Sequence, residues 1–218
     1  MIKSNTPLNL IGFILTTVLS TISWATQAED SVNITANLAY LDVNHNGKKI
    51  RIDRVQDTSN RLTNSFAKTS RPCPSFCIHP IKLAPGIETV GELELLDFLR
   101  TKVKQGTGVL VDARMPQWFE KGSIPGSINI PFTILSSGLD NQHTKKIIKL
   151  LGAREDKNGQ WNFSRVRALM LFCNGSWCDQ SSRAIKSLTQ IGYPKEKLFW
   201  YRGGMQAWQL LGLTVVTP

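Results

Sequence analysis

Short runs of consecutive apolar residues alternate, in the C-terminal part of the chain, with segments whose apolar residues recur at helical spacing. Consecutive apolar residues lie at 109–111, 169–172 and 198–201, and two further candidate strands lie at 87–90 and 128–130. Helical spacing is found at 92–104, where Leu93, Leu96 and Leu99 are expected to face inward, and at 145–151, 184–191 and 205–211. Continuous runs predict buried strands, and a period of 3.6 predicts helices that bury one face. Alternating strands and helices predict an α/β fold, with a parallel central sheet covered by helices on both faces.

The residues before position 85 follow a different pattern. Residues 38–43 and 50–55 alternate between apolar and polar, and Asn46-Gly47 between them is a strong turn signal, so we expect a two-stranded hairpin. Residues 71–80 contain three prolines beside Cys73 and Cys77, which excludes a regular helix. We call residues 71–80 the strap. It is either a structural turn closed by a disulfide or a second thiol pair lying near Cys173.

The first residues are typical of a secretory signal peptide. Lys3 is the only early charge, residues 8–19 are mostly apolar, and small residues lead to Ala28. We expect cleavage after Ala28, with Ala25 as the second choice and an uncleaved anchor as the alternative. The expected organisation is a signal peptide at 1–28, an extension at 29–84 and an α/β domain at 85–218. The protein would then be periplasmic or otherwise exported, with no stable membrane insertion after removal of the signal.

The formal net charge of +10, from 26 basic and 16 acidic residues, narrows the choice of partners. The basic residues are scattered and form no dense tract, which is untypical of nucleic-acid binding. A diffuse positive field favours small anionic substrates instead. We therefore expect a small anion as partner and no nucleic acid.

The candidate chemistry is centred on Cys173. It follows the apolar run 168–172 and precedes a polar loop and a helical segment, so strand, loop and helix are expected in that order. Loop N–H groups and the positive end of a helix dipole favour the thiolate of a cysteine placed there. A pKa lowered by about two units would make the thiolate the major species at pH 7.

Cys178 lies five residues after Cys173, and a curved loop could bring the two within disulfide range. It is a candidate resolving thiol, a partner in thiol–disulfide exchange, or half of a structural disulfide. Four cysteines allow three fully paired connectivities, of which we expect Cys73 with Cys77 and Cys173 with Cys178. A four-thiolate zinc site is disfavoured by the cysteine spacing, and we expect no metal.

Four ordered landmarks, from about Ala84 to the C-terminus, resemble the rhodanese family of sulfurtransferases. They are the strand ending in Asp-x-Arg at 109–114, the segment Gly-Ser-Ile-Pro-Gly-Ser-Ile-Asn-Ile-Pro at 122–131, the cysteine loop at 168–183, and Gly-Gly-Met-Gln-Ala-Trp at 203–208. Ser123 stands where the family usually has His. The resemblance implies a rhodanese-like domain in which Cys173 attacks the outer sulfur of a thiosulfate-like donor. The resulting persulfide passes its sulfur to a thiol or cyanide, and no cofactor is needed.

The resemblance also implies site residues. Cys173 is the expected catalytic residue with Cys178 beside it, and Asp112 supports Arg114. The expected substrate-binding residues are Asn174, Gly175, Ser176, Trp177, Asp179, Gln180, Ser181 and Arg183. The loop is two residues longer than is usual, and Gln180 stands where a basic residue is common, which leaves the donor open. The alternatives are a non-catalytic rhodanese-like binding module and a thiol–disulfide redox protein with a redox protein partner.

Overall fold

The computed structural model describes residues 31–218, which form one compact unit. The predicted signal peptide at 1–28 lies outside the described residues. Within the described part of the chain, no helix combines the length and the apolar character needed to cross a bilayer.

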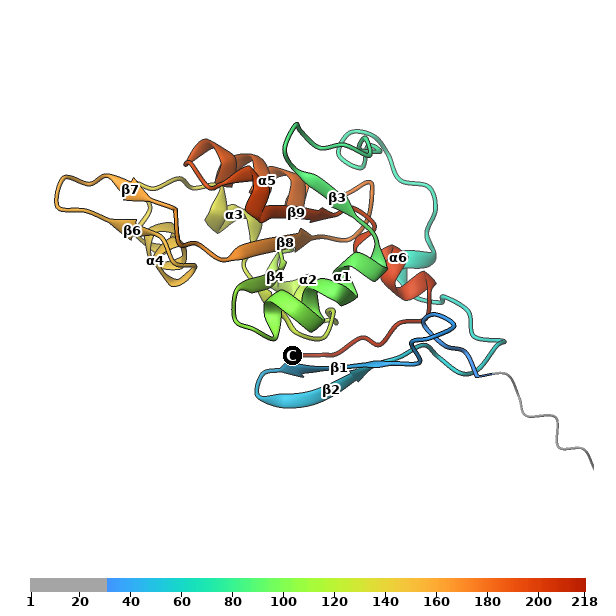
Figure 1. The fold of residues 1–218 in the computed structure, drawn as a ribbon. Coiled ribbons are helices and arrows are strands. Elements are labelled where there is room, and N and C mark those ends of the chain that lie inside the picture. Colours follow the sequence, from blue (N-terminus) through green and yellow to red (C-terminus); the bar gives the residue numbers. More distant parts are fainter. Residues whose placement is uncertain (1–30) are drawn as a thin grey trace, which may run out of the picture. The chain divides into compact units, whose positions relative to one another are not determined.

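A five-stranded parallel sheet forms the centre of the fold (Figure 1). Its strands are β3 (Glu88–Val90), β4 (Gly108–Asp112), β5 (Ser127–Asn129), β8 (Ala168–Phe172) and β9 (Leu198–Tyr201). Their order across the sheet is β3-β9-β8-β4-β5, and every neighbouring pair is parallel. The predicted parallel sheet is confirmed, and β8, which leads into the cysteine loop, is its central strand.

Helices cover both faces of the sheet because successive side chains of a strand point to opposite faces. In β8, Leu169 and Leu171 belong to one buried cluster, whereas Met170 and Phe172 belong to the other. Helices α3 (Phe132–Leu135), α4 (Gln142–Leu150) and α5 (Gln180–Gln190) complete the first cluster. Helices α1 (Glu92–Phe98) and α6 (Gly204–Leu210) complete the second. Each fully buried aliphatic or aromatic side chain contributes about 1.5–3 kcal/mol of transfer free energy.

Two local predictions need correction. The helix expected at 92–104 ends as α1 at Phe98 and continues as a π-helical turn, η2 (Leu99–Val103). Leu93, expected to face inward, is 52% exposed, because it lies about 200° around the helix from the buried Leu95. Residues 152–163, between α4 and β8, contain a small hairpin of β6 (Arg154–Glu155) and β7 (Trp161–Asn162).

The extension packs onto the second buried cluster. Its antiparallel hairpin, β1 (Leu41–His45) and β2 (Lys48–Ile52), turns at Asn46 and Gly47, both at positive φ as a type I′ turn requires. The predicted hairpin is thus confirmed, with both strands nearer the turn than expected. Ile52 and Phe66, the latter in the 3-10 turn η1 (Ser65–Ala67), are buried among residues of α1 and α6. The extension therefore shares a core with the α/β domain.

Candidate active site

Cys173 follows β8 directly and begins the loop that leads to α5. The carbonyl groups of Cys173 and Asn174 accept hydrogen bonds from the N–H groups of Met205 and Gln206, at 3.0 and 2.9 Å. The first turn of α6 therefore holds the start of the loop. This close approach requires Gly204, at φ +55°, because a Cβ there would overlap the carbonyl oxygen of Cys173.

The Cys173 sulfur is buried, with 2% of the residue exposed, and it has two close polar neighbours. The Ser181 hydroxyl donates to Sγ at 3.3 Å, and the Cys178 carbonyl oxygen lies 3.1 Å from it. The indole Nε1 of Trp200 donates to Ser181 Oγ at 3.0 Å. Because that bond occupies a lone pair of the hydroxyl, the hydroxyl proton is directed at the sulfur.

Opposing influences set the pKa of Cys173. Burial is the largest and disfavours the thiolate. The Cys178 thiol, the Ser181 hydroxyl and the N–H groups of Ser181 and Gly175 favour it, and together they lower the pKa from 9.0 to about 7. The direction is the one that the loop pattern predicts. Two side chains, however, contribute more than the ring of amide groups on which the prediction rested.

The pKa of Cys178 is shifted in the opposite direction. The adjacent Cys173 sulfur, followed by burial, raises the pKa of Cys178 well above its ordinary value. Both residues are free thiols, so the expected Cys173–Cys178 disulfide is not formed. Instead, the Asn174 Nδ2 group donates a weak hydrogen bond to the Cys178 sulfur at 3.9 Å. One thiol is thus poised as a thiolate while its neighbour stays protonated beside it.

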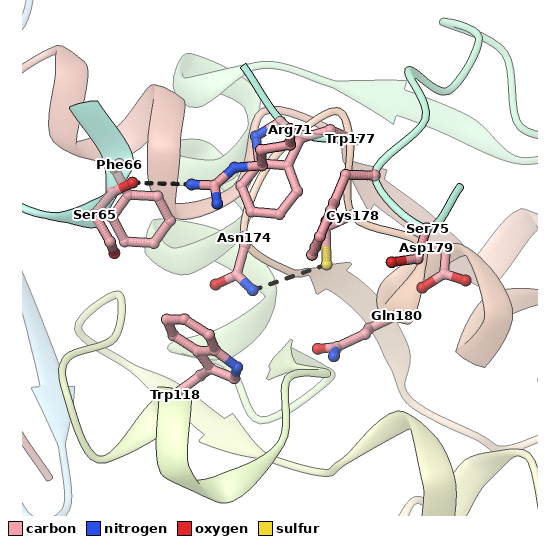
Figure 2. Close-up of a pocket in the computed structure, with 11 residues that line it drawn as sticks. Ser65, Phe66, Arg71, Ser75, Trp118, Asn174, Trp177, Cys178, Asp179 and Gln180 are labelled. Atoms are coloured by element: carbon pink, nitrogen blue, oxygen red, sulfur yellow. Dashed lines mark hydrogen bonds between the residues drawn. The ribbon is translucent and has the colours of Figure 1, made fainter. Parts of the chain in front are cut away.

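A pocket of about 280 Å³ opens beside the loop (Figure 2). It is lined by Ser65, Phe66, Arg71, Ser75, Phe76, Trp118, Asn174, Trp177, Cys178, Asp179 and Gln180. Cys178 belongs to this lining and the buried Cys173 does not, so the pocket meets the less acidic of the two thiols. No cluster of metal-ligating side chains occurs anywhere in residues 31–218.

The structure divides the predicted substrate-binding residues into two groups. Those lining the pocket are Asn174, Trp177, Asp179 and Gln180. Those outside its lining are Gly175, Ser176, Ser181 and Arg183. Ser181 contacts the Cys173 sulfur instead, and Arg183 is exposed, with its guanidinium 4.7 Å from the Phe132 ring centroid.

Asp112 and Arg114 form a buried ion pair beneath the loop. The Asp112 carboxylate accepts from Arg114 Nε at 2.8 Å and from Ser123 Oγ at 2.7 Å. Arg114 also donates to the Gly122 carbonyl at 2.7 Å and, through Nη1, to Asn174 Oδ1 at 3.4 Å. Asp112 therefore acts as the strut for Arg114 that we expected, and Arg114 connects the end of β4 to the loop.

Sequence reasoning missed the part of the pocket that comes from outside the loop. The extension contributes Ser65, Phe66, Arg71, Ser75 and Phe76, and α2 (Pro116–Phe119) contributes Trp118. The strap contacts the loop directly, because the His79 N–H donates to the Ser176 carbonyl at 2.9 Å. A Cys73–Cys77 disulfide closes the strap, as expected. The prolines and cysteines marked the strap as unusual, but no local pattern says which loop it contacts.

Parts of this chain are similar in sequence or in structure to known proteins. An HTH-type transcriptional regulator of Mycobacterium tuberculosis is 27% identical over 110 residues, which are 50% of this chain and 38% of the regulator. The chain thus spans well under half the length of that curated relative. A rhodanese-related protein of Thermoplasma volcanium has a TM-score of 0.40 at 21% identity, over 60% of this chain and 99% of its own. A human single-domain sulfurtransferase has a TM-score of 0.39 at 25% identity, and the match covers 56% of this chain and 94% of the sulfurtransferase.

The family assignment depends on the match to a family model. The model of the Rhodanese-like domain matches residues 95–211, which is more than half of the 218 residues. The match includes β4, β8, β9 and the whole cysteine loop. Together with the parallel sheet whose central strand leads into Cys173, it shows that the chain belongs to the family of rhodanese-like domain proteins.

Proposed function

We propose that this protein is a sulfurtransferase that moves sulfane sulfur from an anionic donor to a thiol or cyanide through a persulfide on Cys173. The observation that carries the proposal is the environment of the Cys173 sulfur. Its pKa is lowered to about 7 although it is buried, and Ser181 and Cys178 both interact with it. A thiolate is the nucleophile that sulfur transfer requires.

The first step is attack by the Cys173 thiolate on the outer sulfur of the donor. With thiosulfate, the new bond joins the two sulfurs, the sulfur–sulfur bond of the donor breaks, and sulfite leaves with the bonding pair. Cys173 then carries a persulfide anion, which the Ser181 hydroxyl and the loop N–H groups stabilise as they do the thiolate. The donor reaches Cys173 when the Cys178 side chain, which stands in the pocket wall, turns aside.

The second step returns the enzyme to its starting state. Cyanide or an acceptor thiolate attacks the outer sulfur of the persulfide, and Cys173 leaves as thiolate. When no acceptor is bound, Cys178 attacks the Cys173 sulfur instead, hydrosulfide leaves with the Cys178 proton, and a Cys173–Cys178 disulfide forms. A dithiol of an external redox protein then reduces that disulfide by exchange.

Cyanolysis tests this proposal. Protein incubated with thiosulfate and then cyanide should release thiocyanate, and Cys173→Ser should abolish the release. Cys178→Ser is the matched control, which should still release thiocyanate but should show no disulfide at Cys173 in mass spectra, whereas the strap disulfide remains. A Cys173→Ser variant that transfers sulfur as well as the parent would refute the proposal.

The thiol pair favours thiol–disulfide exchange as a second candidate. Two adjacent free thiols, one with a lowered and one with a raised pKa, are the arrangement such exchange uses. Cys173 would attack a substrate disulfide and release one thiolate, and Cys178 would then displace the other. This candidate predicts that Cys178→Ser traps a mixed disulfide and that the parent releases no thiocyanate.

We also propose that the protein works outside the cytosol. The Cys73–Cys77 disulfide supports an oxidising compartment, where such bonds persist. Mass spectrometry of the protein recovered from its native compartment would test both the cleavage and the disulfide. The recovered protein should begin at Glu29 and carry the strap disulfide, whereas an intact Met1 with reduced cysteines would contradict export.

A further inference from the structure

The extension supplies the pocket with a cation that the cysteine loop lacks. Residues 174–180 contain no Lys or Arg, and among the described residues that line the pocket Arg71 is the one cation and Asp179 the one carboxylate. The Arg71 guanidinium lies over the Trp177 ring, 4.2 Å from its centroid. Figure 2 shows Arg71 and Trp177 on one side of the pocket and Trp118 on the other, with Cys178 between them.

Arg71 differs from Arg114 and Arg183 because its charge is not neutralised by a carboxylate. No carboxylate within residues 31–218 forms an ion pair with it, and its one recorded hydrogen bond runs from Nη2 to the Ser65 carbonyl at 2.9 Å. Its Nε is buried without a partner in the described structure. The charge of Arg114 is neutralised by the Asp112 carboxylate, and Arg183 Nη1 lies 3.8 Å from Asp179 Oδ2. A guanidinium held over an aromatic ring with unused donors is suited to an anionic ligand.

Four of the nine other residues that line the pocket are aromatic. Phe66, Phe76, Trp118 and Trp177 all line the pocket, and the Phe76 and Trp177 rings meet edge to face at 5.5 Å. A small dianion such as thiosulfate is strongly hydrated, and it would face one guanidinium, a nearby Asp179 carboxylate and apolar rings. Desolvating two charges against one cation is unfavourable. A monoanion with an apolar body matches both the single cation and the rings.

We infer that the donor is an organic thiosulfonate, with its sulfonyl oxygens on Arg71 and its aryl or alkyl group between the aromatic walls. The inference rests on the proposed sulfurtransferase function and names its substrate class. The Cys173 thiolate attacks the terminal sulfur, the bond between the two donor sulfurs breaks, and the organic sulfinate leaves with the electron pair. Arg71 binds the sulfonyl group before the reaction and the sulfinate after it. The strap is thus part of the substrate site.

The binding test uses inert analogues, so that it does not depend on turnover. Benzenesulfonate, benzenesulfonamide and sulfate are titrated calorimetrically into the full chain. Benzenesulfonate should bind most tightly, because it alone combines the single negative charge with the ring. Arg71→Ala should weaken benzenesulfonate by about 10-fold to 100-fold, the usual effect of losing a charge-assisted hydrogen bond. Benzenesulfonamide should bind Arg71→Ala and the parent equally.

Matched variants distinguish the loss of the Arg71 charge from a loss of folded structure as the cause of weaker binding. Arg61→Ala removes an exposed arginine of the same extension that forms no side-chain hydrogen bond or ion pair within residues 31–218, and it should leave all three affinities unchanged. Arg71→Lys keeps the charge and should retain more affinity than Arg71→Ala. Trp118→Ala should weaken the binding of benzenesulfonate without affecting the binding of sulfate. If Arg71→Ala fails to fold, the comparison of benzenesulfonate with benzenesulfonamide in the parent still tests the role of charge.

Turnover distinguishes failure of this inference from failure of the proposed function. The parent should use benzenethiosulfonate with a higher kcat/KM than thiosulfate, and Arg71→Ala should remove that preference. Sulfate binding as tightly as benzenesulfonate, or an Arg71→Ala variant that binds benzenesulfonate normally, would overturn the inference. Tight benzenesulfonate binding without any sulfur transfer would instead refute the proposed function and leave the assignment of Arg71 standing.

Discussion

At the scale of single residues, one hydroxyl group and one neighbouring thiol lower the pKa of Cys173 more than the loop N–H groups do. Ser181 donates to the sulfur because Trp200, on a neighbouring strand, fixes the direction of its hydroxyl. Cys178 favours the thiolate of Cys173 while its own pKa rises. Burial disfavours the thiolate, so removing either group should raise the pKa of Cys173.

The pH dependence of Cys173 alkylation measures these contributions. The thiolate is the reactive form and its population rises with pH, so iodoacetamide labelling should reach half its maximal rate near pH 7. Ser181→Ala and Cys178→Ala should each move that midpoint to higher pH. Ser182→Ala is the control, since its buried hydroxyl bonds the Asp179 carbonyl and not the sulfur. A midpoint near 9 in the parent, read from the Cys173 peptide by mass spectrometry, would contradict the assignment.

At the scale of elements, the loop is held between α6, the ion pair beneath it and the strap. The α6 backbone bonds the carbonyls of Cys173 and Asn174, and Arg114 reaches the Asn174 side chain. The His79 N–H bonds the carbonyl of Ser176 on the other side. Three elements distant in sequence therefore fix one loop, and the loop backbone leaves no room for a Cβ at Gly204.

Gly204→Ala tests this contact. The new Cβ would meet the backbone of Cys173 and Gly175, and a positive φ adds about 1 kcal/mol or more of strain. Gly212→Ala is the control, because it carries the same kind of strain, at φ +65°, with its nearest neighbour at 3.5 Å. Both variants should lose stability in urea titrations, Gly204→Ala more than Gly212→Ala. Only Gly204→Ala should change the rate of Cys173 alkylation, and equal rates in the two variants would argue against the contact.

At the scale of the whole molecule, the extension and the rhodanese-like domain share one core. Ile52 is fully buried in the cluster that contains α1 and α6, although it lies well before the matched residues 95–211. Because the same extension also contributes Arg71 to the pocket, its packing and the shape of the site are linked.

Ile52→Ala should therefore destabilise the whole molecule. Removing a buried Ile side chain should lower the free energy of unfolding by about 2–5 kcal/mol. Tryptophan fluorescence and far-ultraviolet circular dichroism should still report one cooperative transition. Val55→Ala, at a position 44% exposed, is the control and should have little effect. Two separate transitions would show that the extension unfolds independently.

The sequence by itself determined the parallel sheet, its central strand and the cysteine at the end of that strand. These features depend on local periodicity and on residue types adjacent in the chain, so β8 and α5 could be read directly. Leu93 was misplaced because several positions of one helix fit an apolar stripe, and only packing against the sheet selects among them.

Only the tertiary structure decided which groups surround the sulfur and line the pocket. Trp200 is 19 residues from Ser181, and Arg71 is far from Trp177 in the chain, so no local pattern joins them. Whether Cys178 bonds Cys173 or lines the pocket beside it also depends on the curvature of the loop, which α6 and the strap impose from outside. Such contacts form because distant apolar surfaces pack together, and their geometry follows from that packing.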